Sequence, residues 1–179
     1  MSKTSDEIEK IARTWQLTKD ALALVRREVI KQSKGKSEYK LLVRTNFEDL
    51  PLSDVQFELK SCQEANEDFA ILSMWTAFER RLVLRLEDEC RKMQGQTPSE
   101  FNQVVFEKII NAVEYWRIDE ALDLIKPLVG SDLSGSAKNI KRYRDWIVHR
   151  NPRKPTPAKI DPQSAKEILK LITDSLDRA

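Results

Sequence analysis

The stretch DFAILSMWTAFERRLVLRL, from Asp68 to Leu86, decides the fold class of this chain. It continues an apolar spacing of three and four residues that begins near Ser53 and passes through Val55, Leu59, Cys62, Asn66, Phe69 and Leu72. This spacing is typical of one face of an amphipathic helix. VQFEL, residues 55–59, alternates like a strand, but Ser53 followed by Gln56 has the pattern of a helix capping box. We therefore expect a helix from near Ser53 to about Lys92.

A helix of this length constrains the shape of the molecule. About 40 residues at 1.5 Å each span roughly 60 Å. That is long for a single domain unless the helix bends or breaks.

The residues before Ser53 predict one further helix and a connector. From about Thr4 to Gln32 an apolar stripe recurs at helical spacing, formed by Ile8, Ile11, Trp15, Thr18, Leu22, Val25 and Val29. Gly35 fits the C-cap of this helix. The connector, residues 36–52, includes KLLVRTNFEDLPL, which we expect to lie as a loop against the core.

Two helices are expected between residues 97 and 130. TPSEF, Thr97–Phe101, carries the clearest start signal, since Thr97 suits the N-cap, Pro98 the first helical position and Glu100 the end of a capping box. The face of this helix comprises Phe101, Val105, Ile109, Ala112 and Trp116. A shorter helix, DEALDLIKPLVG, follows, and Pro127 and Gly130 are expected to end it.

The last part of the chain predicts two helices separated by an extended connector. A Ser- and Gly-containing link, SDLSGS, leads into a helix at residues 137–149 whose core face is Ile140, Tyr143 and Ile147. Residues 151–159 contain three prolines and are expected to be extended. Asp161 and Pro162 start a final helix whose inward face is Ala165, Ile168, Leu169, Ile172 and Leu176.

These segments together predict an all-α fold, a bundle of four main helices plus one or two short helices. The length of 179 residues suits a single domain, residues 1–179. Residues 1–35 form its N-terminal helix, 36–52 the connector and 53–179 the bundle. Four glycines are few for a sheet protein with tight turns.

The sequence indicates a cytoplasmic protein without a cofactor. Cys62 and Cys90 have the character of reduced, semi-buried thiols. The N-terminus MSKTSDEIEK has no apolar signal core, and no run approaches the roughly 20 apolar residues that cross a bilayer. One histidine and two distant cysteines argue against a metal site, and no Gly-rich phosphate loop is present. We expect no metal, no cofactor and no membrane partner.

Positive charge is concentrated late in the chain. From Lys138 to Lys159 there are eight Lys and Arg residues and one acid, Asp145, so this segment carries +7 while the whole chain carries +2. Such asymmetry favours an anionic partner, with nucleic acid first, although a solvated basic face is the simpler reading. The residues expected to contact RNA are Lys141, Arg142, Arg150, Asn151, Arg153 and Lys154.

The only histidine of the chain, His149, lies within this basic segment, in KRYRDWIVHRNPRKP. An arginine can hold two phosphate oxygens, and an imidazole with a pKa near about 6.5 can accept or donate a proton at neutral pH. Arg144 and His149 therefore supply the groups for cleaving RNA without a metal. Five residues along a helix correspond to about 7.5 Å of rise and about 140° of rotation, so the two do not lie side by side. Two copies across a two-fold axis would make a fuller groove, which favours a homodimer.

The motif Arg144-Asp145-Trp146-Ile147-Val148-His149, near the end of a late helix in an all-α chain, resembles the HEPN superfamily. The pattern of that family is Arg, a polar residue, and His after four to six residues. WTAFERRL resembles the helix that packs behind the motif, and the final amphipathic helix also fits. The resemblance covers roughly Ser53 to the C-terminus, and the short motif gains specificity only from this helical context.

The resemblance implies a metal-independent endoribonuclease that acts as a homodimer, often as a toxin or as an antiviral or stress effector. It implies that Arg144 and His149 are catalytic and that Asp145 orients them. It also implies a possible antitoxin or other regulatory protein as partner. One subgroup has a Tyr between the Arg and the His that becomes modified. This chain has none there, since Tyr143 precedes Arg144.

Other interpretations of the same residues remain open. A histidine at a helix end is often a C-cap, and the chain could be a non-catalytic HEPN-like module that binds nucleic acid or a partner protein. Glu79 could be a buried partner of Arg144 or part of an ordinary surface salt bridge. The motif's apolar residues Trp146, Ile147 and Val148 suit packing in the core or at an interface. Trp15, Trp75 and Trp116 each fit an apolar stripe and are read as core residues.

Overall fold

The computed structural model describes residues 3–35, 43–48, 50–94, 107–112, 116–150, 153 and 155–178. Over these residues the protein is an all-α helical bundle, as predicted. The long helices are α1 (Lys3–Ser33), α2 (Leu52–Gln94), α6 (Ser131–His149) and α7 (Pro162–Arg178), and the short ones are α4 (Ile118–Leu124) and α5 (Lys126–Val129). Residues 107–112 are also helical. In this part of the chain no helix is both long enough and apolar enough to cross a bilayer.

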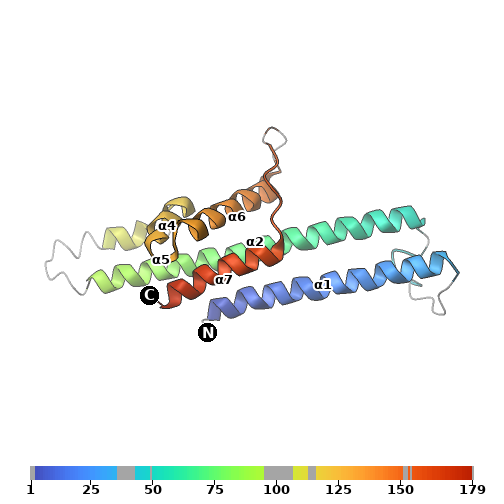
Figure 1. The fold of residues 1–179 in the computed structure, drawn as a ribbon, viewed down its shortest axis with the longest axis horizontal. Coiled ribbons are helices and arrows are strands. Elements are labelled where there is room, and N and C mark those ends of the chain that lie inside the picture. The colour runs from blue at the N-terminus through green and yellow to red at the C-terminus, as the bar shows by residue number, and fades with distance from the viewer. Residues whose placement is uncertain are drawn as a thin grey trace.

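Helix α2 sets the elongated shape of the molecule. It runs for 43 residues without a break, and α1 lies alongside it for most of the length of the molecule (Figure 1). The other helices cover only one half of this pair (Figure 1). We expected so long a helix to bend or break, and this expectation is wrong. The helix runs unbroken because the molecule is elongated.

The main core lies where α1, α2, α4, α6 and α7 meet. Trp75 and Phe78 of α2 are fully buried there, with ring centroids 5.4 Å apart. Trp15 of α1 is also buried, whereas Trp116 is half-buried. The apolar face of α7, formed by Ala165, Leu169, Ile172 and Leu176, is buried against this core. The predicted inward faces of α6 and α7 are thus confirmed, although Ile168 is only partly buried.

A second, smaller core lies in the half of the α1–α2 pair that the other helices leave uncovered (Figure 1). We call this half, residues 19–33 of α1 and 52–63 of α2, the arm. Its buried residues are Val29, Val55 and Leu59, with Leu22, Val25 and Phe47 packed against them. Two helices alone bury little apolar surface, so we expect the arm to be less stable than the main core.

The predicted start of α2 near Ser53 is confirmed to within one residue, but the predicted cap is not, and the predicted start of α6 is wrong. Helix α2 begins at Leu52, and the carbonyl of Pro51 accepts the N–H of Asp54 at 3.0 Å and of Val55 at 3.1 Å. Ser53 is therefore inside the helix and does not cap it. Helix α6 begins at Ser131, so SDLSGS is its first turns and not a link. Gly130, with φ of 87°, precedes this helix and makes the turn that a side chain would strain.

Two further details differ from the sequence prediction. DEALDLIKPLVG forms two short helices rather than one, and Pro127 lies in the first turn of α5, where a missing N–H costs little. On α2, Cys62 and Phe69 are exposed although the stripe placed them inward. The buried stripe of α2 shifts as its neighbours change from α1 alone to α1, α6 and α7. The predicted start at Thr97–Phe101 lies outside the described residues.

Candidate functional site

Helix α6 presents the motif residues to one side of the main core. Its buried face includes Ala137, Ile140, Tyr143 and Ile147, which are in contact with the other helices. Arg144 and Asp145 are consequently half-buried beside this face, and His149 is exposed in the last turn. The helix ends at Arg150, whose φ of 37° is left-handed and whose N–H donates to the carbonyl of Trp146 at 2.7 Å.

The guanidinium of Arg144 lies between two carboxylates. Its Nη2 is 3.3 Å from Oε2 of Glu79 on α2, and its Nη1 is 2.9 Å from Oδ1 of Asp145. The side chains of Arg144 and Glu79 are 30% and 33% exposed. This ion pair is therefore neither deeply buried nor a free surface contact. It fixes Arg144 against the helix that packs behind the motif.

Asp145 connects Arg144 to a second cation. Lys141 Nζ lies 3.0 Å from Asp145 Oδ2 and 3.1 Å from Asp119 Oδ2 of α4. Partial burial acts to raise the pKa of Asp145, but the hydrogen bonds and charges of Lys141 and Arg144 outweigh burial and hold that pKa below its ordinary value. Asp145 is thus a carboxylate at neutral pH, held by two cations.

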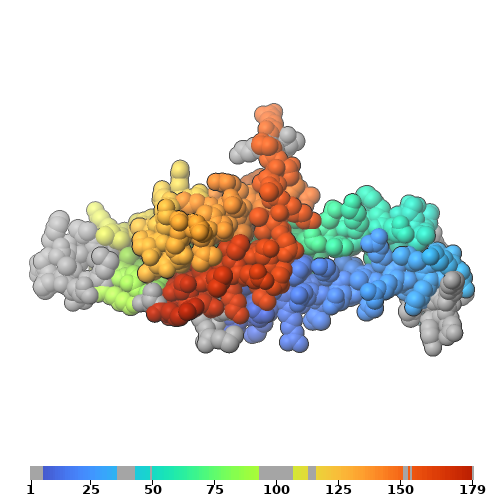
Figure 2. All heavy atoms as spheres, viewed as in Figure 1, coloured from blue at the N-terminus to red at the C-terminus, as the bar shows by residue number. Residues whose placement is uncertain are grey.

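An open cavity of about 580 Å³ lies beside His149. Its wall on α6 is formed by Arg142, Asp145, Trp146 and His149, and its other wall by Pro155, Thr156 and Pro157. This connector projects from the body of the molecule (Figure 2). Asp145 and His149 are four residues apart and so share one helix face. Arg144 joins this group through its hydrogen bond to Asp145.

The buried carboxylate of Asp68, on α2, accepts hydrogen bonds from two residues at the C-terminal end of α6. Tyr143 Oη donates to Asp68 Oδ1 at 3.1 Å, and Arg150 Nη2 donates to Oδ2 at 2.7 Å. Burial, with the charge of Asp68, raises the pKa of Tyr143 to about 12. Arg150 also lies over the ring of Trp146, 5.7 Å from its centroid. Sequence reasoning missed Asp68, although an acid at the start of the apolar run FAILSMW was an available signal.

The basic segment is largely neutralised in the folded chain. Besides Arg144, four cations of the segment pair with carboxylates of α2 or α4: Lys138 with Asp123, Lys141 with Asp119, Arg150 with Asp68, and Lys159 with Glu67. Of the expected RNA-contacting residues, Arg142, Arg150 and Arg153 are exposed, and Arg142 Nη1 lies 3.1 Å from Asn139 Oδ1. Asn151 and Lys154 lie outside the described residues. The sequence count of +7 therefore overstates the field that a ligand meets.

Among the residues that the structure describes, no group of three or more His, Cys, Asp or Glu side chains is placed to hold a metal ion. Comparison of the chain with known protein families, with curated proteins and with solved structures found no match.

Proposed function

We propose that the protein is a metal-independent endoribonuclease of the HEPN type. The observation that supports this most strongly is the position of Asp145. It hydrogen-bonds Arg144 at 2.9 Å and lines the same cavity as His149. One carboxylate thus contacts Arg144 and lies in the wall of the cavity that His149 also lines. It lies on the exposed side of α6, where a polynucleotide can approach.

The chemistry divides between the two side chains. The imidazole of His149 takes the proton of the ribose 2′-hydroxyl or returns one to the leaving 5′-oxygen. The 2′-oxygen forms a bond to phosphorus as the bond to the 5′-oxygen breaks, which leaves a 2′,3′-cyclic phosphate. Arg144 uses two of its five N–H donors on Glu79 and Asp145. The remaining donors are available for the phosphate oxygens, on which negative charge develops.

A homodimer would complete the site. His149 is exposed and Arg144 is held toward α2, so one copy offers an open arrangement of the catalytic groups. Val148 between them is 54% exposed, and Trp146 is half-buried. A second copy that covers this face would bury these apolar side chains and add its own Arg and His. A role as a toxin or as an antiviral or stress effector, with an antitoxin or other regulator, belongs to the same proposal.

A second candidate is a non-catalytic HEPN-like module that binds nucleic acid or a protein. It is favoured by the ion pairs, since Arg144, Lys141 and Arg150 each contact carboxylates of this chain. Such cations can serve to hold α6 on the bundle. This candidate predicts binding without cleavage, and it assigns no role to the imidazole of His149.

The test is to incubate the purified protein in EDTA with total RNA and, separately, with heat-denatured DNA. The proposal predicts that RNA is cleaved to products with 2′,3′-cyclic phosphate ends, as measured by mass spectrometry, and that DNA stays intact because it lacks the 2′-hydroxyl. Cleavage of both polymers would point to a different nucleophile. Binding of RNA without cleavage would favour the second candidate.

A further inference from the structure

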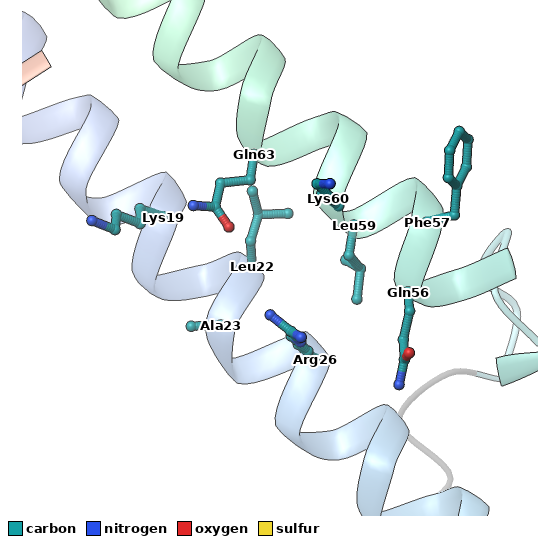
Figure 3. Close-up of a pocket in the computed structure, with 9 residues that line it drawn as sticks. All are labelled: Lys19, Leu22, Ala23, Arg26, Gln56, Phe57, Leu59, Lys60 and Gln63. Carbon is teal, nitrogen blue, oxygen red and sulfur yellow. The ribbon is translucent and has the colours of Figure 1, made fainter. Parts of the chain in front are cut away.

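A second concave surface lies far from α6, on the arm. It is a groove of about 370 Å³ between α1 and α2 (Figure 3). The residues that line it are Lys19, Leu22, Ala23 and Arg26 of α1 and Gln56, Phe57, Leu59, Lys60 and Gln63 of α2. We call it the arm groove. It shares no residue with the cavity beside His149.

The arm groove has an apolar floor and a cationic rim. Leu22 and Leu59 lie between the two helices at its base, and Phe57 points away from α1 (Figure 3). Phe57 is 68% exposed and lines the groove beside the apolar floor. The charged side chains at the edge are all positive.

Among the described residues, the cations of the rim have few acidic neighbours, although the charge of Lys19 acts on the carboxylate of Glu67. No Asp or Glu is among the described residues that line the groove. Arg26 makes no ion pair with any residue that the structure describes. Lys60 lies 3.9 Å from Glu64, but both side chains are more than half exposed, so that pair contributes little. Lys19 lies over the ring of Trp15.

The arm groove lies next to the part of the α1–α2 pair against which α7 packs. Helix α7 packs against both α1 and α2 and buries one apolar face there. It begins at Pro162, and Lys159 just before it contacts Glu67 of α2. Gln63, one turn before Glu67, already lines the arm groove. Figure 1 shows α1 and α2 continuing past the start of α7 without a third helix. The arm groove is therefore the next stretch of the same helix pair after the one that α7 covers.

We propose that the arm groove binds an acidic amphipathic helix of another protein. Its apolar face would cover Leu22, Leu59 and Phe57, as α7 covers the same helix pair further along, and its Asp and Glu side chains would meet the cationic rim. A second copy of this chain fits poorly here, because a symmetric contact would place like charges together. The phosphates of a nucleic acid would pair with the cations, but no apolar group of the ligand would cover the floor of the groove.

The probe is a panel of fluorescein-labelled peptides of about 16 residues, with Leu at helical spacing on one face and Glu on the other. A matching panel with Lys in place of Glu and a single-stranded RNA of about 12 nucleotides serve as alternative ligands. Binding to the full chain is measured by fluorescence anisotropy. The groove variant is Lys19→Glu with Arg26→Glu. Its control is Arg13→Glu with Arg27→Glu, which makes the same charge change at exposed positions of the same helix outside the groove.

We expect a Glu peptide to bind. Its Kd for the groove variant should be at least about tenfold higher than its Kd for the unaltered chain. The control variant should keep the Kd of the unaltered chain, and the Lys peptides should not bind. The proposal is overturned if no Glu peptide binds up to about 1 mM, or if both variants weaken binding equally, since that would show only the net charge. It is also overturned if the RNA binds and loses affinity only in the groove variant while the peptides do not bind.

Discussion

Adjacent residues of α6 have separate tasks. Tyr143 and Ile147 face inward and hold the helix in the bundle. Arg144 and Asp145 lie at the boundary and are fixed by ion pairs. His149 is exposed at the helix end. The proposed proton transfer by His149 requires an accessible imidazole, and the exposure of His149 meets that requirement.

Tyr143→Phe tests how much the hydrogen bond between Tyr143 and Asp68 stabilises the fold. It removes the hydrogen bond to Asp68, leaves Asp68 with Arg150, and should lower the free energy of unfolding by about 1–3 kcal/mol at neutral pH. The folded chain raises the pKa of Tyr143 from 10 to about 12. A raised pKa stabilises the fold fully below about pH 10, and this stabilisation is lost as the pH rises toward 12.

The measurement is denaturant unfolding of both proteins from pH 7 to 12. The difference in unfolding free energy between wild type and Tyr143→Phe should be constant up to about pH 10 and then shrink. Lysines titrate in both proteins and largely cancel in this difference. A difference that stays constant to pH 12 would mean that Asp68 and burial do not shift the Tyr143 pKa.

The sequence predicted the residues of the motif but not the contacts to Asp68 that fix the end of α6. Arg144, Asp145 and His149 are close in sequence, so helical geometry relates them. The contacts of Tyr143 and Arg150 to Asp68 join positions 75 and 82 residues apart, and no local pattern encodes such a pairing. The alternatives for Glu79 were both partly right, because its ion pair with Arg144 is about one-third exposed.

At the scale of the elements, α2 belongs to two cores. Its second half supplies Ile71, Met74, Trp75 and Phe78 to the main core, and its first half packs on α1 in the arm, with Phe47 against the same small core. Spacing predicted a helix here but not which neighbours it meets, so it misplaced Phe69. The start of α6 was also misjudged. Ser and Gly are typical of links, but the Oγ of Ser134 donates to the carbonyl of Leu122 at 3.2 Å inside the fold, and this tertiary contact outweighs propensity.

The unequal cores predict unequal local stability. Native-state hydrogen exchange should show amides of residues 55–62 and 22–29 exchanging through local opening, with a lower free energy than amides of residues 71–82. The reason is that the arm buries three side chains while the main core buries Trp75, Phe78 and their many neighbours. Equal protection along all of α2 would show that the helix opens only as a single cooperative unit.

In the whole molecule, exposed positive charge is not concentrated in the basic segment in the way that the count along the sequence predicted. The basic segment lies against acids of α2 and α4, whereas the charged side chains that line the arm groove are all cations. Composition and periodicity were sufficient to predict an all-α bundle, because they depend on local spacing. The distribution of exposed charge depends on which helices meet, and a linear count cannot supply it.

The proposed site also predicts the assembly state. The protein should be a homodimer by multi-angle light scattering at tens of micromolar, since a second copy would cover Val148 and Trp146 and complete the groove. Val148→Glu would place a charge in that contact and should shift the mass toward the monomer without unfolding the chain, because Val148 is exposed. A monomeric wild-type protein would count against a composite site.

The proposed catalytic role of His149 predicts a large difference between His149→Ala and the wild type in the rate at which each cleaves total RNA in EDTA. His149 is exposed, so the variant should keep the circular dichroism spectrum and thermal midpoint of the wild type. Loss of a proton-transfer group should reduce the cleavage rate by about 10²–10⁴-fold. Cleavage near the wild-type rate by a folded His149→Ala protein would contradict the account.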